Sequence, residues 1–347
     1  MKILLTGHKG YIGAVAGTML REAGHTLVGL DTDLFAGCDF GVPAETIPEI
    51  RKDLRDLQEG DLEGFNAVVH LAALSNDPLG DLNPNLTYEI NHLGSVRLAE
   101  LAKKAGVERF VFSSSCSTYG AAGDNILDET AGLNPVTPYA ESKVMVERDL
   151  AQFADEHFSP TCMRNSTAYG VSPRLRLDVV LNDLVASAFT KGQVYIKSDG
   201  SPWRPIVHVR DIIGAILSVL EAPRSAIHNE VFNVGRTEEN FRIRDLAEIV
   251  AETVPGCRIE YAPGGGPDKR CYRVNCDKIR RVLPRFKPQW DARRGAQELY
   301  NGYLAAGLTA AEVDSGQYTR IKHLRSLLSD DAVDASLRRC AQGVALA

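Results

Sequence analysis

Met1-Lys-Ile-Leu-Leu-Thr-Gly7-His-Lys-Gly10-Tyr-Ile-Gly13 opens the chain, and this stretch decides its fold. The first residues are mostly apolar and predict a buried strand, residues 6–10 predict a tight turn, and the residues from 11 onward have helical apolar spacing. Glycines let the backbone approach a phosphate, and the N–H groups and positive dipole end of the helix face the anion. The strand–turn–helix order therefore predicts a pyrophosphate site.

A second apolar strand, residues 26–30, ends in Asp31. A carboxylate about 20 residues after such a turn accepts hydrogen bonds from a ribose diol and repels a 2′-phosphate, so NAD is favoured over NADP. These features predict an α/β fold, a Rossmann doubly wound parallel sheet. The competing interpretation is an α/β domain whose glycine turn holds no ligand.

Composition limits the class of protein. A chain of 347 residues with 44% hydrophobic and 24% charged residues has the composition of a soluble globular protein. The net charge of −6 argues against nucleic-acid binding, although local arginines can still bind small anions. No apolar run reaches membrane-spanning length, and the first strand leaves no room for a signal peptide. The seven scattered cysteines lack Cys-x-x-Cys spacing, which predicts reduced thiols, a cytoplasmic location and no metal site.

Small residues end the strand predicted over residues 67–73, where a dinucleotide could lie close to the sheet edge. Residues 35–48 read as a loop. Residues 50–56 predict either a short strand that brings Asp53 and Leu54 near the adenine or a charged turn. Residues 83–105 predict a helix in which Asn91 either supports the site through a hydrogen bond or is solvated.

Hydroxyl groups follow the next strand, in Glu108-Arg-Phe-Val-Phe-Ser-Ser-Ser-Cys-Ser-Thr-Tyr-Gly120. A loop then leads to Thr137-Pro-Tyr-Ala-Glu-Ser-Lys143, which opens a helix predicted to reach about residue 157, with a threonine cap and proline in the first turn. Tyr139 and Lys143 are four residues apart, so they project from the same helical face.

Several motifs occur in the order of one known family: Thr-Gly-His-Lys-Gly-Tyr-Ile-Gly, His-Leu-Ala-Ala, Ser-Ser-Ser-Cys-Ser-Thr-Tyr-Gly, Tyr-Ala-Glu-Ser-Lys, Arg-Pro-Ile-Val-His-Val-Arg-Asp and Val-Phe-Asn-Val-Gly. The chain resembles the extended short-chain dehydrogenase/reductases of the nucleotide-sugar epimerase/dehydratase group over residues 1–280. The resemblance implies a Rossmann domain over 1–172, with 207–240 returning to it. It also implies a smaller, sequence-interleaved substrate domain over 173–206 and 241–330, and a tail over 331–347.

The resemblance also implies the chemistry. Tyr139 would take a proton from a sugar carbinol, while Lys143 favours the phenolate and holds the nicotinamide ribose. Ser115, or Ser114 one place earlier, would share a hydrogen bond with the substrate oxygen. Related dehydratases have an Asp-Glu pair at the positions of Cys116 and Ser117, so dehydration is disfavoured. Cys116 is either an acid/base on neighbouring carbons or a buried thiol that fills space.

Binding residues follow from the same motifs. The predicted NAD-binding residues are Gly7, Gly10, Tyr11, Ile12, Gly13, Asp31, Asp53, Leu54, Leu71, Ala72, Ala73, Asn91, Ser113, Tyr139 and Lys143. The predicted substrate-binding residues are Asn165, Thr167, Asn182, Arg204 and Arg270, with Arg273 as a weaker candidate. Thr167 replaces the asparagine that the family usually has. Arginine suits a diphosphate because its planar fork makes bidentate hydrogen bonds.

The expected function is NAD-dependent epimerisation of a nucleoside-diphosphate sugar, at C4 through a transient 4-keto intermediate, with NAD tightly bound. The alternatives are a sugar reductase or dehydrogenase, a 4,6-dehydratase and, from another class, a dinucleotide-sensing protein without activity. The resemblance implies a homodimer formed by the helices near 90–105 and 139–157, whose apolar faces could equally be core.

Overall fold

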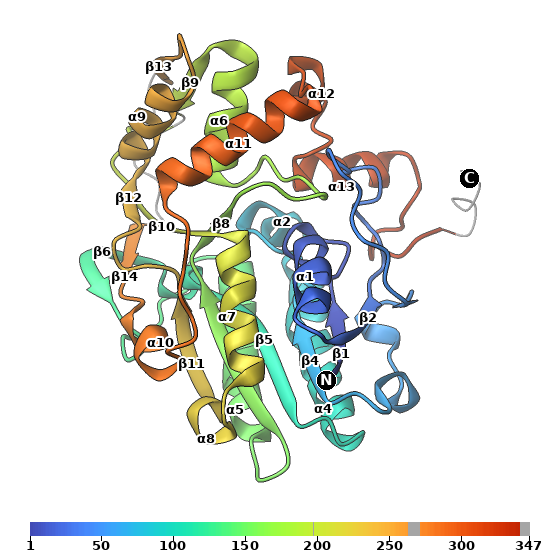
Figure 1. Ribbon diagram of the computed structural model, residues 1–347. Coiled ribbons are helices and arrows are strands. Elements are labelled where there is room, and N and C mark those ends of the chain that lie inside the picture. Colours follow the sequence, from blue (N-terminus) through green and yellow to red (C-terminus); the bar gives the residue numbers. More distant parts are fainter. Residues whose placement is uncertain (197, 263–270, 341–347) are drawn as a thin grey trace.

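A seven-stranded parallel sheet forms the larger lobe of the computed structural model, which describes residues 1–196, 198–262 and 271–340 (Figure 1). Its order is β3-β2-β1-β4-β5-β7-β11. The strands are β1 Lys2–Thr6, β2 Thr26–Leu30, β3 Glu49–Ile50, β4 Ala67–His70, β5 Arg109–Ser115, β7 Ser159–Asn165 and β11 Glu230–Val234. The strand order reverses between β1 and β4, which places a ligand crevice at their carboxyl ends. The predicted Rossmann doubly wound sheet is confirmed.

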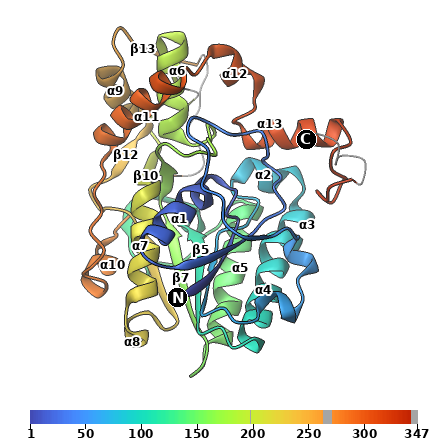
Figure 2. The same ribbon diagram turned by 45° about the vertical axis from the view of Figure 1, so that its right-hand side comes forward.

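Helices cover both faces of this sheet, as Figure 2 shows with α1 and α7 on one side and α4 and α5 on the other. The helices of this lobe are α1 Tyr11–Glu22, α2 Asp77–Leu82, α3 Pro84–Thr87, α4 Gly94–Lys104, α5 Pro138–Phe153, α7 Val209–Glu221, α8 Arg224–Ile227 and α10 Asp277–Val282. Short 3-10 turns span Leu54–Asp56, Glu59–Leu62 and Cys116–Tyr119, and a π-helical turn spans Tyr88–Leu93.

The strands are apolar on both faces because both are covered. In β1, Ile3 and Leu5 pack with Ile212 of α7, whereas Leu4 between them packs with Leu98 of α4. All five side chains are fully buried. The continuous apolar run at the start of the chain is therefore the pattern of a central parallel strand, and not the alternation of a strand with one wet face.

A second lobe lies beyond the carboxyl ends of the large sheet (Figure 1). Its helices are α6 Val180–Lys191, α9 Ile243–Thr253, α11 Ala292–Ala306 and α12 Ala310–Ser315, followed by α13 Arg320–Ser329. Its strands are β8 Thr167–Tyr169, β9 Gln193–Ile196, β10 Trp203–His208, β12 Asn240–Arg242 and β13 Arg258–Tyr261. The strands β6 Ala121–Leu127 and β14 Cys271–Val274 pair beside it. Buried apolar residues of α6, α9 and α11 form its own core.

Several boundaries differ from the sequence prediction, and the strand predicted over residues 67–73 ends at His70. The strand predicted over residues 50–56 is only β3, and the chain then makes a 3-10 turn capped by Asp53. The helix predicted to reach residue 157 ends at Phe153, because Asp155 accepts two backbone N–H groups just beyond it and turns the chain into β7. In the segment 207–240, α7 and β11 join the large sheet, whereas β10 and β12 pair in a separate three-stranded sheet.

A buried ion pair fixes α5 against β7. Arg164 Nη2 donates to Glu147 Oε2 at 2.7 Å, and the two side chains are 6% and 7% exposed. Ser114 Oγ donates to the other carboxylate oxygen of Glu147, and Arg164 Nη1 donates to the Tyr119 hydroxyl at 3.0 Å. Because α5 also carries Tyr139 and β5 ends at the serine run, this network sets the distance between the helix and the strand ends.

Arg164→Met should lower the free energy of unfolding by about 3–5 kcal/mol, because it leaves the Glu147 carboxylate buried without its cation. Urea unfolding followed by circular dichroism measures the change. Arg285→Met is the matched control, because the Arg285–Glu221 pair is 76% and 38% exposed. It should change stability by about 1 kcal/mol or less. Equal losses in the two variants would show that the buried pair has no special role.

Candidate active site

The turn between β1 and α1 leaves room for an anion and excludes side chains. Gly7 has φ +72°, and a Cβ there would lie 2.7 Å from the Ala72 nitrogen. A Cβ on Gly13 would lie 2.0 Å from the carbonyl oxygen of Gly7. Among the described residues, no side chain caps α1 at Gly10 and no acidic residue occupies the first helical turn. The N–H groups at the start of α1 can therefore bind a phosphate.

Asp31 lies beside this turn at the end of β2. Its Oδ2 accepts the Lys9 N–H at 2.9 Å, and its Oδ1 accepts the Asp33 N–H at 2.8 Å. Burial raises the pKa of Asp31, and the two backbone hydrogen bonds act against that rise. The position is the one that a ribose-binding carboxylate needs.

A cavity of about 1180 Å³ runs from this turn along the strand ends to the second lobe. It brings together most of the side chains that the sequence singles out. Its lining includes Gly7, Gly10, Tyr11, Ile12, Gly13, Asp31, Asp53, Leu54, Leu71, Ala72, Ala73, Ser113, Ser114, Ser115, Ser117, Tyr139, Lys143, Asn165, Thr167 and Arg204.

Tyr139 stands in the first turn of α5, which begins where Thr137 Oγ1 accepts the Ala140 N–H at 3.2 Å. Burial raises the pKa of Tyr139 to about 12, although a hydrogen bond with Ser115 acts in the opposite direction. Ser115 ends β5, so the strand delivers its hydroxyl to the phenol oxygen. This contact supports Ser115 over Ser114, whose hydroxyl is held by Glu147.

Lys143 lies one helical turn further along α5 and is 4% exposed. Its Nζ donates to the Ser113 carbonyl at 2.7 Å and lies 5.8 Å from the centroid of the Tyr139 ring. Burial lowers the pKa of Lys143 to about 7, and the Glu147 carboxylate acts against that fall. Burial is thus the largest influence on the pKa of both Tyr139 and Lys143.

Cys116 does not line the cavity. It is fully buried, and its thiol donates to the Arg164 carbonyl at 3.1 Å. Burial raises its pKa to about 12, so the thiol is neither accessible to a substrate nor easily ionised. The acid/base role considered for Cys116 therefore does not fit, and the space-filling role does. Ser117 does line the cavity, and its Oγ has no hydrogen-bond partner among the described residues.

Two predicted binding asparagines hold loops instead of lining the cavity. Asn91 is 1% exposed; its Oδ1 accepts the Leu74 N–H at 2.8 Å and its Nδ2 donates to the Leu74 carbonyl at 3.0 Å. Asn182 is fully buried, and its Oδ1 accepts the Gly170 N–H at 3.0 Å. Direct contact with NAD by Asn91 or with substrate by Asn182 is therefore not supported, because each amide is used by the backbone.

The predicted substrate residues are spread along the second half of the cavity. Asn165 ends β7 and Thr167 begins β8, and the Asn165 Oδ1 is buried without a hydrogen-bond partner among the described residues. Arg204 lines the cavity from β10 while 8% exposed. Arg270 lies outside the described residues, and Arg273 is not part of the lining.

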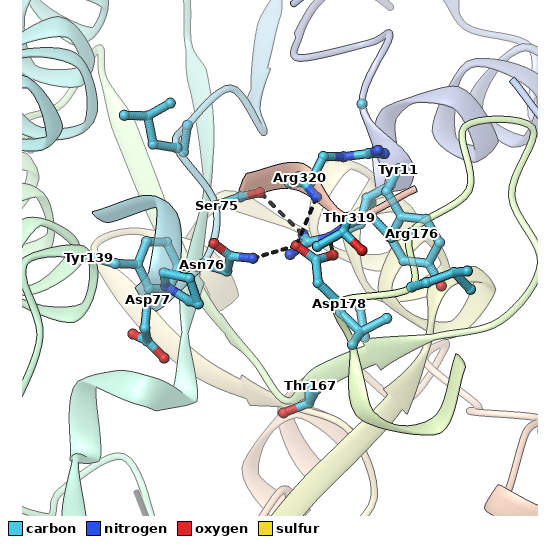
Figure 3. A pocket seen from close by; sticks show the side chains of 18 of the residues that line it. Tyr11, Ser75, Asn76, Asp77, Tyr139, Thr167, Arg176, Asp178, Thr319 and Arg320 are labelled. Atoms are coloured by element: carbon cyan, nitrogen blue, oxygen red, sulfur yellow. Dashed lines mark hydrogen bonds and ion pairs between the residues drawn. The ribbon is translucent and has the colours of Figure 1, made fainter. Parts of the chain in front are cut away.

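Sequence reasoning missed a polar cluster centred on Asp178 (Figure 3). Asp178 Oδ1 pairs with Arg176 Nε at 2.7 Å, and its Oδ2 accepts Asn76 Nδ2 at 2.6 Å and the Arg320 N–H at 3.3 Å. These residues line the cavity and come from three distant parts of the chain. Asn76 comes shortly after the small residues Ala72 and Ala73 that follow β4, so its position was a usable signal. Arg320 stands in a region without any motif.

The described residues hold no cluster of His, Cys, Asp or Glu suited to a metal ion. None of the helices in the described ranges is long and apolar enough to cross a bilayer. All seven cysteines have free thiols.

Comparison with known proteins agrees with this geometry. The model of the NAD dependent epimerase/dehydratase family matches residues 3–235. The UDP-glucose 4-epimerase of Lactobacillus helveticus is 30% identical over 318 residues, which cover 83% of this chain and 92% of that protein.

Two solved structures have the same fold. MoeE5 in complex with UDP-glucuronic acid and NAD is 28% identical, with a TM-score of 0.76 over 88% of this chain and 99% of that one. The UDP-glucose 4-epimerase of Thermotoga maritima with UDP-glucose is 25% identical, with a TM-score of 0.76 and the same coverage. The glycine turn, the Asp31 carboxylate and the Tyr139–Lys143 pair agree with these comparisons: this chain is an enzyme of the NAD dependent epimerase/dehydratase family, and NAD is its cofactor.

Proposed function

We propose that this enzyme inverts C4 of a nucleoside-diphosphate sugar, with UDP-hexoses as the substrate class. The observation that carries the proposal is the contact of Ser115 with Tyr139 in the cavity, next to Lys143 and without a carboxylate pair after Ser115. The relatives named UDP-glucose 4-epimerase and the UDP-glucose complex support this class of substrate.

The glycine turn after β1 and Asp31 would hold NAD, which would supply the hydride acceptor for the sugar carbinol and the donor for its return. Tyr139 removes the carbinol proton and gives it back, while Ser115 holds the same oxygen through a hydrogen bond. A buried phenolate and a buried ammonium are each unfavourable alone, but each stabilises the other when both form. Lys143, one turn from Tyr139 and held by the Ser113 carbonyl, supplies that ammonium.

Elimination of water needs an acid and a base beside the sugar, and the chain offers neither after Ser115. Cys116 is fully buried, and burial raises the pKa of its thiol to about 12. Ser117 offers only a neutral hydroxyl. These properties favour return of the hydride over formation of a 4-keto-6-deoxy product. A reductase or dehydrogenase is the alternative, and it would change the redox state of NAD stoichiometrically.

We assign the sugar nucleotide to residues 173–206 and 241–330, opposite the dinucleotide on 1–172. Arg204, on β10, would bind the diphosphate because it is a cationic residue that lines the cavity from the second lobe. The unpartnered Asn165 Oδ1 and the Thr167 hydroxyl would bind the sugar hydroxyls. A homodimer through α4 and α5 would cover Leu93, which is 58% exposed at the start of α4. The unpaired cysteines favour a cytoplasmic enzyme.

Tyr139→Phe should reduce epimerisation of UDP-glucose to UDP-galactose by about 10²- to 10⁴-fold, because the variant lacks the proton acceptor. NAD affinity should stay within about twofold, since the ring remains in place. Product formation is measured by chromatography of the nucleotide sugars, and absorbance at the nicotinamide band reports any net reduction of NAD. Tyr261→Phe is the control, because Tyr261 is 52% exposed and outside the cavity lining. Full activity in Tyr139→Phe would refute the assignment.

The free energy of unfolding of the NAD-free enzyme should rise with pH through the action of Lys143. Burial lowers the folded pKa of Lys143 to about 7, below its ordinary value of 10.5, so between these values the unfolded chain binds more protons and stability increases. Relative to Lys143→Met, the wild-type enzyme should gain about 2 kcal/mol between pH 7 and pH 9. Urea unfolding at the two pH values measures the difference. A gain of the same size in both proteins would show that Lys143 is charged in the folded state.

A further inference from the structure

Helix α13 sends a charged side chain back into the cofactor cavity. Arg320 is the first residue of α13, lines the cavity and is only 2% exposed. Its guanidinium lies 4.5 Å from the Phe35 ring centroid, and its Nη2 donates to the Arg174 carbonyl at 3.2 Å. Figure 3 shows the side chain reaching from the Asp178 cluster toward Tyr11.

Among the described residues, no carboxylate forms an ion pair with the Arg320 guanidinium. Its Nη1 is buried and has no hydrogen-bond partner among the described residues. Asp178 accepts the Arg320 backbone N–H, but its oxygens are also engaged by Arg176 and Asn76. Burial lowers the pKa of Arg320 to about 10, and the neighbouring guanidinium groups of Arg176 and Arg174 act in the same direction. A buried cation in such surroundings is stabilised by an anion.

The surroundings of Arg320 indicate which anion. The positive charge of Arg320 acts to lower the pKa of Tyr11, the first residue of α1. Its guanidinium lies over the ring of Phe35, which follows β2. Both residues belong to the dinucleotide side of the cavity, whereas Arg204, the diphosphate candidate for the sugar nucleotide, comes from β10 in the second lobe. The uncapped N-terminus of α1 and the unpartnered Nη1 of Arg320 therefore belong to the same, dinucleotide-binding part of the cavity.

We infer that Arg320 is a ligand of the NAD pyrophosphate, delivered by the C-terminal segment 319–340. Its Nη1 donates to a phosphate oxygen that the N–H groups of α1 approach from the other side. The segment is held in place at its far end, where Arg338 Nη2 donates to Asp56 at 3.0 Å and Leu337 enters the cavity lining. The C-terminal segment thus completes the cofactor site that the opening glycine turn begins.

Arg320→Met tests the inference through NAD binding and needs no activity measurement. Methionine keeps the contact with Phe35 and removes the charge. We expect NAD affinity, measured by titration calorimetry of the NAD-free protein, to fall about 10- to 100-fold. The share of protein that keeps NAD through gel filtration should fall with it. Arg325→Met is the matched control, because Arg325 is an exposed arginine of the same helix, and its NAD affinity should equal that of the wild type.

UDP binding shows whether Arg320 contacts the pyrophosphate of NAD or the diphosphate of the sugar nucleotide. UDP affinity should be unchanged in Arg320→Met, and loss of UDP affinity with NAD affinity intact would overturn the inference. Unchanged NAD affinity in both variants would overturn it as well. Thermal unfolding of the NAD-free proteins excludes a purely structural role, because loss of an uncompensated buried charge should leave Tm equal or higher. If Tm falls, Arg320→Lys decides: recovery of NAD affinity supports a phosphate contact, and no recovery refutes it.

Discussion

Close packing of backbone against backbone at the seam between β1 and β4 is the constraint on which the site depends. Gly7 and Ala72 approach so closely that a methyl group at Gly7 would meet the neighbouring main chain. The Thr6 hydroxyl strengthens this seam, since it bonds to His70 at 2.7 Å and accepts the Ala72 N–H at 3.3 Å. The dinucleotide can therefore lie directly on main-chain atoms, and every other part of the site is placed relative to that seam.

Burial, more than pairing, sets the charges around the reacting groups. Tyr139 and Lys143 lie one helical turn apart, yet without ligands both are driven toward their neutral forms. Glu147 opposes this for Lys143 and is itself balanced by Arg164. Lys143 in the cavity, Glu147 one turn further along α5 and Arg164 on β7 are thus electrostatically linked. Lys143 can therefore exchange a proton near neutral pH, whereas Tyr139 stays neutral until a positive charge lowers its pKa.

The sequence predicts the Rossmann half well, because there the residues and the backbone requirements coincide. The cavity is lined, as expected, by the glycines of the turn, by Asp31 after β2, and by Tyr139 and Lys143. Sequence prediction fails for the direct ligand contacts expected of Asn91 and Asn182, whose amides bond to the backbone. For Cys116, the structure fits the space-filling role, one of the two alternatives that the sequence left open. The Asp178 cluster could not be predicted as a whole, because Asn76, Asp178 and Arg320 lie far apart in the chain and sequence patterns report only local spacing.

The cofactor crevice is lined by both ends of the described chain, the glycine turn after β1 and the start of α13. Contacts of such long sequence separation form late in folding, since the loop between them must close first. During synthesis on the ribosome, the Rossmann strands can assemble well before α13 emerges. The crevice is complete only at that point, so firm retention of the dinucleotide marks a chain that has been translated through α13.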